Sequence, residues 1–110
     1  MNCSPCWPAA TSRKFSPNAK YTYIEANSTV FGIRFKDLPR NPNGCPLVSD
    51  SSSDIYSEPI DVTKYGVIYA GAQKNLGPSG VVLVVIRKDF LATAKKDLPG
   101  ILSYQEHAKN

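Results

Sequence analysis

Residues 65–86 read YGVIYAGAQKNLGPSGVVLVVI, and this stretch decides the fold. Its first apolar run, residues 66–70, predicts a buried strand. Its second run, residues 81–86, predicts a strand that is apolar on both faces and therefore lies inside a covered sheet. Between the runs, Pro78 fixes its own φ, and three glycines permit backbone angles that residues with a Cβ avoid. We therefore expect a rigid tip between two strands that presents Lys74.

Two interpretations of Lys74 follow from its position. A lysine held at a strand end against apolar surroundings loses hydration of its charged form, which favours the neutral amine and makes it a nucleophile. A lysine in an ordinary hairpin loop is instead solvated and has only a structural role. The pattern alone leaves both interpretations open.

Three further strands are predicted upstream of this stretch. Aromatic and β-branched residues mark two of them, at residues 21–26 and 30–35, and a short apolar run that ends in an acid marks the third, at residues 46–50. The connection at residues 51–65 is long enough for a crossover between parallel strands. We therefore expect the runs that end at Ala26, Asp50 and Ala70 to be parallel neighbours, with residues 30–35 in a side ribbon.

The tip carries a specific family resemblance. Residues 70–80, AGAQKNLGPSG, closely resemble the cofactor-lysine segment of the phosphoserine aminotransferase family. The resemblance covers roughly residues 16–110, in order and with similar spacing. It includes the segments VSDSSS at 48–53, PIDVTKYG at 59–66 and LPGILSY at 98–104.

This resemblance implies a fold class and a domain organisation. The expected fold is α/β, part of the large domain of a fold-type I transferase that uses pyridoxal phosphate (PLP). Its sheet would be mostly parallel, with an antiparallel strand at residues 81–86. Residues 15–110 would form an incomplete aminotransferase large domain, and residues 1–14 an irregular arm that the resemblance does not reach.

The strand ends would place Thr29, Asp50 and Lys74 on one edge, because ligands of open α/β sheets bind beyond the carboxyl ends of strands. An amine and an acid at one cavity suit PLP, which needs a lysine for its aldehyde and a carboxylate that keeps its ring nitrogen protonated. Each residue also has a plain structural explanation. Asp50 could form a turn in the serine-rich loop, Thr29 could bond the backbone at a strand end, and Gln73 could be an exposed turn amide.

By resemblance, each of these residues has a role. Lys74 would be the Schiff-base lysine and, once freed, the base that moves a proton. Asp50 would pair with the pyridinium nitrogen, Gln73 would hydrogen-bond the cofactor phosphate, and Thr29 would contact the cofactor near its ring or phosphate.

The neighbourhood of these residues adds two expectations. Ser52 and Ser53 stand beside Asp50 in the sequence and could orient it. The chain departs from the family near the site: Ser28 stands where the family usually has Glu, Asp54 where it often has Asn, and Glu58 where it often has Arg.

The implied activity is amino-group transfer between phosphoserine or glutamate and the matching 2-oxo acids, in L-serine biosynthesis. Family members are homodimers several times longer than this chain. The chain is therefore expected to be truncated, inactive alone, and either marginally stable, aggregation-prone or dependent on association. Alternatives are another fold-type I PLP enzyme, such as a desulfurase, and a non-catalytic remnant or interaction fragment.

Composition excludes several other classes of function. The chain has 110 residues, and its net charge of +4 is scattered rather than clustered, so no nucleic acid is expected. No run of about 18 apolar residues is present, so neither a membrane span nor a membrane partner is expected. No secretory or transit segment is readable, which favours a cytoplasmic protein, with an organelle left open.

The cysteines and the histidine carry no site in this interpretation. Cys3 and Cys6 form a lone C-x-x-C without the second ligand pair of a structural zinc site, so no metal is expected. His107 is expected at the surface or in an interface. Residues 90–97 predict a helix capped by Asp89, and residues 101–110 predict a loop.

Overall fold

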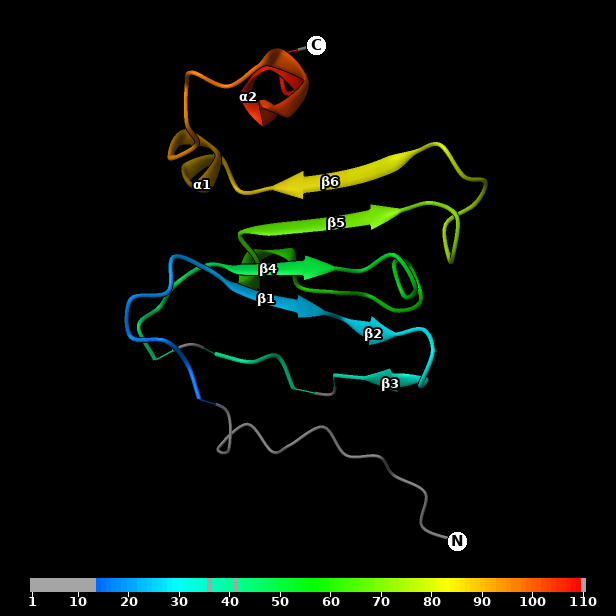
Figure 1. The fold of residues 1–110 in the computed structure, drawn as a ribbon. Coiled ribbons are helices and arrows are strands. Elements are labelled where there is room, and N and C mark those ends of the chain that lie inside the picture. Colours follow the sequence, from blue (N-terminus) through cyan, green and yellow to red (C-terminus); the bar gives the residue numbers. More distant parts are fainter. Residues whose placement is uncertain (1–13, 36, 41, 110) are drawn as a thin grey trace, which may run out of the picture.

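A computed structural model describes residues 14–35, 37–40 and 42–109, and Figure 1 labels the elements. Those elements are β1 (Thr22–Glu25), β2 (Asn27–Ser28), β3 (Ile33–Arg34), β4 (Leu47–Asp50), the 3₁₀ turn η2 (Val62–Lys64), β5 (Val67–Gly71), β6 (Val82–Ile86), α1 (Lys88–Ala92), the 3₁₀ turn η3 (Gly100–Leu102) and α2 (Tyr104–His107). The arm predicted for residues 1–14, with Cys3 and Cys6, lies outside these ranges except for Lys14.

The main sheet has four strands in the order β1-β4-β5-β6. β1, β4 and β5 are parallel, whereas β6 runs antiparallel to β5. This arrangement confirms the predicted α/β class, with a mostly parallel sheet and one antiparallel strand. In register, Asp50 lies between Glu25 and Tyr69, so the carboxyl ends of the three parallel strands meet at one edge.

A separate ribbon of β2 and β3 continues from the end of β1 (Figure 1). It confirms the predicted side ribbon, but the strand predicted for residues 30–35 is too long. Val30 and Phe31 lie in the turn and are largely exposed. Gly32 has a φ of +61° and donates its N–H to Ser28 O at 2.8 Å, which closes the turn just before pairing begins.

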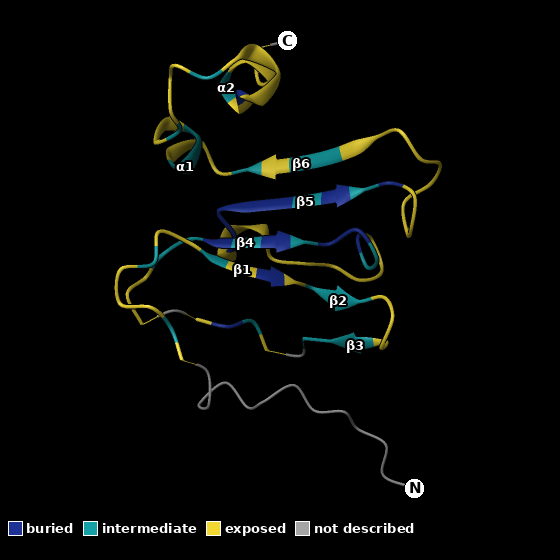
Figure 2. Cartoon of the chain, viewed as in Figure 1, coloured by how far each residue is buried: buried dark blue, intermediate teal, exposed yellow. Residues whose placement is uncertain are grey.

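The core lies on the three parallel strands β1, β4 and β5. Figure 2 shows β4 and β5 as the most buried strands. The buried cluster consists of Ile24, Leu47, Ile55, Tyr65, Ile68 and Ala70. β-branched and small residues pack closely on such pleated surfaces, which is why the first apolar run of the tip segment forms the most buried strand.

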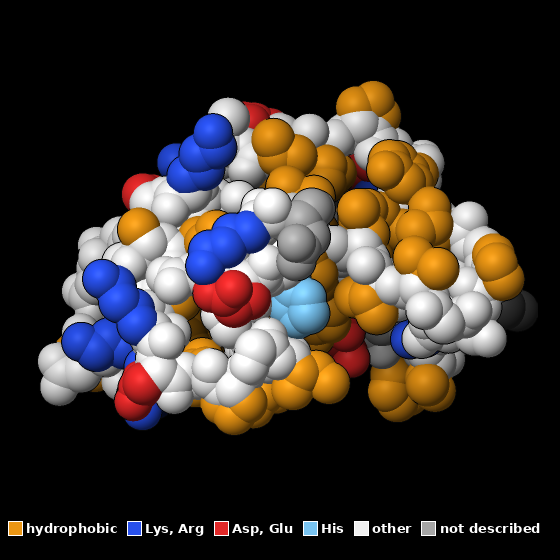
Figure 3. Space-filling view, turned by 90° about the horizontal axis from the view of Figure 1, so that it is seen from above, with side chains coloured by type: hydrophobic (Ala, Val, Ile, Leu, Met, Phe, Trp, Pro, Cys, Tyr) orange, Lys and Arg blue, Asp and Glu red, His pale blue; other side chains and the backbone are white. Residues whose placement is uncertain are grey.

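β6 does not lie inside a covered sheet, so that expectation is wrong for the described residues. It forms an edge of the sheet, and Val82 and Val85 are 64% and 42% exposed. The reason is that β6 pairs with β5 on one side only and has little packed on its faces. Viewed from the α2 side, hydrophobic side chains gather over one half of the face, and Lys and Arg gather over the other (Figure 3).

The predicted helix at residues 90–97 is α1, but its ends differ. α1 begins after Arg87, not Asp89, and Asp89 lies in its first turn. Asp89 Oδ1 accepts from Arg87 Nε at 2.6 Å and from Phe90 N at 2.7 Å. At the other end, Thr93 turns both its N–H and its hydroxyl to Phe90 O, so the helix stops early.

The loop predicted for residues 101–110 is also wrong, because α2 forms there. Ser103 precedes α2 and its side chain accepts from Glu106 N at 3.3 Å. Ser-x-x-Glu is a recognised start signal of helices and was present in the sequence. Among the described residues, no helix is long and apolar enough to cross a membrane.

Candidate functional site

The strand ends bring together the side chains singled out in the sequence. Lys74 follows β5, and its Nζ donates to Thr29 Oγ1 at 2.9 Å, although the two residues are far apart in the sequence. Asp50 is the last residue of β4 and is close enough for the charge of Lys74 to act on its carboxyl. The predicted edge with Thr29, Asp50 and Lys74 is therefore present.

The carboxylate of Asp50 is held by the residue two positions along the chain. Its Oδ1 accepts from Ser52 N at 3.0 Å and from Ser52 Oγ at 2.6 Å. Burial would raise the pKa of Asp50, but the bonds from Ser52 and Tyr69 and the charge of Lys74 outweigh it, so the pKa lies below its usual value. Asp50 is thus set up to stay ionised.

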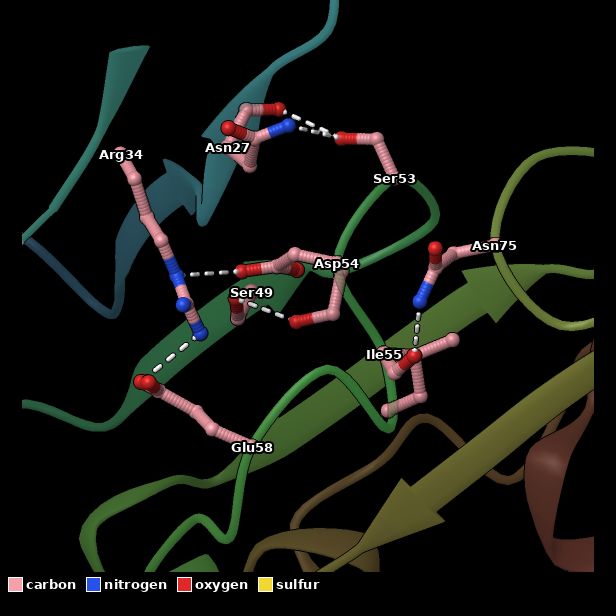
Figure 4. A network of polar contacts seen from close by, with 9 residues as sticks. Asn27, Arg34, Ser49, Ser53, Asp54, Ile55, Glu58 and Asn75 are labelled. Atoms are coloured by element: carbon pink, nitrogen blue, oxygen red, sulfur yellow. Dashed lines mark hydrogen bonds and ion pairs between the residues drawn. The ribbon is translucent and has the colours of Figure 1, made fainter. Parts of the chain in front are cut away.

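Ser52 also ties the end of β4 to the end of β5. Its Oγ accepts from Gly71 N at 2.9 Å while it donates to Asp50. The sequence predicted Ser52 and Ser53 as orienting residues, and the structure supports only Ser52. Ser53 instead donates to Asn27 O at 2.8 Å and accepts from Asn27 Nδ2 at 2.9 Å, which holds the ribbon (Figure 4).

The tip that carries Lys74 is anchored by Asn75, which sequence reasoning missed. Asn75 Nδ2 donates to Ile55 O at 2.6 Å, and Asn75 N donates to Ser52 O at 3.3 Å (Figure 4). These bonds hold the residue after Lys74 against the turn that follows β4. The anchoring role of Asn75 could not be predicted from the sequence, because its acceptor, Ile55 O, lies in the separate connection that follows β4.

Gln73 folds back against the end of β5. A Cβ on Gly71 would stand 2.5 Å from Gln73 Oε1, so a side chain at residue 71 would displace the flexible end of Gln73 from this position. Of the three glycines in the tip, only Gly80 has a left-handed backbone, with a φ of +99°. The turn therefore depends on glycine at Gly80, whereas Gly71 only leaves room for this position of the Gln73 amide.

Lys74 itself is exposed, so the expected apolar surroundings are absent from the part of the chain that the structure describes. The tip projects past the sheet, and Lys74 Nζ hydrogen-bonds the hydroxyl of Thr29 there.

Arg34 forms ion pairs with Asp54 and Glu58, two of the positions at which this chain differs from the family residue. Arg34 Nε lies 3.3 Å from Asp54 Oδ2, and Arg34 Nη2 lies 2.8 Å from Glu58 Oε1 (Figure 4). These ion pairs join β3 to the connection after β4. They border a pocket of about 470 Å³ that none of Thr29, Asp50 or Lys74 lines.

Other candidates contribute little. His107 is exposed, as predicted, and its Nε2 lies 3.2 Å from Ile101 O. Within residues 14–35, 37–40 and 42–109, no three His, Cys, Asp or Glu side chains gather in a way that could hold a metal ion.

Comparison with known proteins gives a consistent picture. The family described as aminotransferase class-V matches residues 7–105. The chain is 48% identical over 103 residues to the phosphoserine aminotransferase of Herpetosiphon aurantiacus, covering 94% of this chain and 28% of that protein. It is 53% identical over 97 residues to the chloroplastic phosphoserine aminotransferase 2 of Arabidopsis thaliana, covering 86% of this chain and 23% of that protein.

Solved structures are similar as well. Phosphoserine aminotransferase from Bacillus circulans subsp. alkalophilus superposes with a TM-score of 0.87 at 43% identity, over 96% of this chain and 29% of that one. The PLP-bound phosphoserine aminotransferase from Trichomonas vaginalis superposes with a TM-score of 0.82 at 41% identity, over 94% of this chain and 30% of that one. The chain thus spans less than a third of the length of these relatives.

Proposed function

The chain belongs to the class-V aminotransferase family, and on that premise we propose that it supplies the central part of the PLP site of a phosphoserine aminotransferase. Residues 15–110 would be an incomplete large domain. The proposed reaction moves an amino group between phosphoserine or glutamate and 3-phosphohydroxypyruvate or 2-oxoglutarate, in L-serine biosynthesis. The observation that supports the proposal is the Lys74 amine, hydrogen-bonded to the Thr29 hydroxyl, at the sheet edge where the ionised Asp50 ends β4 and feels the charge of Lys74.

The chemistry of these groups fits PLP. The cofactor carries an aldehyde that condenses with an amine, a ring nitrogen that pairs with a carboxylate, and a phosphate that accepts hydrogen bonds. Lys74 supplies the amine, and Asp50 supplies a carboxylate that stays ionised because Ser52 and Tyr69 donate to it. Gln73 supplies an amide donor at the tip, where Gly71 leaves room for it.

In the proposed reaction, each residue acts through its own groups. Lys74 Nζ holds the cofactor and then accepts a proton as the general base. Thr29 Oγ1, which receives a hydrogen bond from Nζ, limits where that amine can lie. Asp50 balances a positive ring nitrogen, and Gln73 donates to the phosphate.

The whole reaction requires more than this chain. The family resemblance places substrate-binding arginines and a phosphate-contacting segment in parts of the relatives that the chain does not span. We therefore propose a homodimeric full-length enzyme, and no turnover by the 110-residue chain alone. A cytoplasmic site is proposed, with an organelle as the alternative, since an Arabidopsis relative is named as chloroplastic.

The test is covalent labelling of the purified chain with PLP, followed by borohydride reduction and peptide mass spectrometry. We expect a label on Lys74 that Lys74→Ala abolishes and that Lys95→Ala, a change at another exposed lysine, leaves intact. Equal labelling of the Lys74→Ala chain on scattered surface lysines would contradict the proposal and favour a non-catalytic interaction fragment. Turnover of glutamate and phosphohydroxypyruvate by the chain alone would contradict the expected need for further segments.

A further inference from the structure

Two tyrosines stand on the strands on either side of Asp50. Tyr69 on β5 is the register partner of Asp50 on β4, and Tyr23 lies two residues before Glu25, the partner of Asp50 on β1. Because side chains two residues apart point to the same face of a sheet, all three lie on one face. The hydroxyls of Tyr23 and Tyr69 meet at 3.0 Å.

The chemistry of the three groups fixes the direction of the hydrogen bonds. Tyr69 also hydrogen-bonds the Asp50 side chain, and an ionised carboxylate can only accept. A phenol has a single proton, so Tyr69 gives its proton to Asp50 and its oxygen is left to accept from Tyr23. The result is a one-way chain of donors from Tyr23 through Tyr69 to Asp50. Its outer end is solvated, because Tyr23 is 50% exposed.

The Asp50 carboxylate that Tyr69 contacts also receives bonds from Ser52. Ser52 donates twice to Oδ1, and Tyr69 adds a donor from the neighbouring strand. We propose that Tyr69, with its hydroxyl oriented by Tyr23, is a positioning residue that fixes the orientation of the Asp50 carboxylate. The proposal rests on the proposed function, in which Asp50 pairs with the ring nitrogen of PLP.

The protonation of the tyrosine agrees with this role. Burial and the neighbouring Asp50 carboxylate raise the pKa of Tyr69 above its ordinary value of 10.0. Tyr69 therefore keeps its proton throughout the range in which an enzyme works. A tyrosine that only filled space would need no hydroxyl, and the change Tyr69→Phe separates the two roles because it removes that group alone.

The experiment follows the Asp50 carboxyl by ¹³C NMR of the chain labelled at aspartate, with Asp50→Asn to assign the signal. In Tyr69→Phe, the titration midpoint of Asp50 moves to higher pH, because a donor to the charged form is lost. Tyr23→Phe gives a smaller move in the same direction, because Tyr69 loses the partner that orients it. Tyr104→Phe, a change at a similarly exposed tyrosine on α2, gives no move.

An unmoved midpoint in folded Tyr69→Phe overturns the proposal. If Tyr69→Phe fails to fold, Tyr23→Phe decides, since Tyr23 is at the surface: a move to higher pH supports the proposal and an unmoved midpoint overturns it. No cofactor is needed for these titrations. A moved midpoint in a chain that PLP does not label at Lys74 would therefore uphold the donor chain while the proposed function fails.

Discussion

Asp54 is the described residue whose surroundings suit its charge least. Its side chain is 11% exposed, and its Oδ1 is buried without a hydrogen-bond partner. Burial raises the pKa of Asp54 despite the charge and the hydrogen bond of Arg34. The family often has the neutral amide at this position, which has the same shape without the cost of burying a charge.

The change Asp54→Asn is therefore expected to stabilise the chain at neutral pH by about 1 kcal/mol. An unfolded Asp54 ionises around its ordinary pKa of 3.8, whereas the folded residue holds its proton to higher pH. Charged Asp54 therefore does not destabilise the fold at a pH below its unfolded pKa. The destabilisation grows as the pH rises from the unfolded pKa to the higher folded pKa, and it is complete above the folded pKa. The advantage of the variant should follow the same course.

Urea unfolding at about pH 3 and about pH 7 measures this difference. Asp97→Asn, a change at an exposed aspartate, serves as the control and should show no such pH dependence. A variant less stable than the natural chain at neutral pH would mean that the ion pair with Arg34 outweighs the buried oxygen.

At this scale, the sequence predicted the residue types of the site but not their partners. Asp50, Thr29 and Lys74 could be placed at one edge because parallel strands end together. The bonds of Asn75 to Ile55 and of Tyr69 to Asp50 depend on sheet register and on a connection between strands, which local patterns do not encode. Ser53 shows the same limit, since its partner Asn27 lies on the ribbon.

Among the elements, the junction of β4, β5 and α1 is the most tightly constrained. Gly66 donates its N–H to Leu47 O at 2.8 Å and accepts from Arg87 N at 2.9 Å. A Cβ on Gly66 would stand 2.6 Å from Pro46 Cβ and 3.2 Å from Phe90 Cδ1. The rigid proline ring cannot move away cheaply, so the strands approach only because residue 66 is glycine.

Gly66→Ala should lower the free energy of unfolding by about 1–3 kcal/mol, since overpacking forces the backbone to shift. Gly100→Ala is the matched control, because nothing lies within 4 Å of its added Cβ. Chemical denaturation of both variants gives the comparison. Equal stabilities would show that the junction can relax at no cost.

Strands were easier to predict than helices. The four strands of the main sheet coincide within two residues with apolar, β-branched runs bounded by turn residues. The ends of α1 depend on side chains that bond the nearby backbone, such as Asp89 and Thr93, and both can serve as caps or as helix interruptions. α2 follows a Ser-x-x-Glu signal but is too short to show apolar periodicity.

At the scale of the whole molecule, the sheet has an open edge. This edge is β6. Ala72 N donates to Val81 O and Arg87 N donates to Gly66 O, so the odd-numbered residues of β6 and its flanks form the hydrogen bonds to β5. The backbone groups of Val82, Val84 and Ile86 therefore turn away from β5. An apolar strand with free backbone groups is a template for pairing with another chain, which agrees with the expectation of an association-prone protein.

Val82→Lys should reduce self-association of the chain, because a charged edge residue resists strand pairing. Light scattering over a concentration series measures the effect. Val62→Lys is the control, since Val62 is 51% exposed but lies on η2, away from the edge. If both variants reduced association equally, net charge rather than the β6 edge would be responsible.

The order of strands in space has a consequence for synthesis. β4 lies beside β1, β5 beside β4 and β6 beside β5, so every strand of the main sheet meets its neighbour in the order in which it is translated. A nascent chain leaving the ribosome can add strands one after another, without inserting a late strand between two earlier ones. These four strands would then assemble in the order β1, β4, β5 and β6.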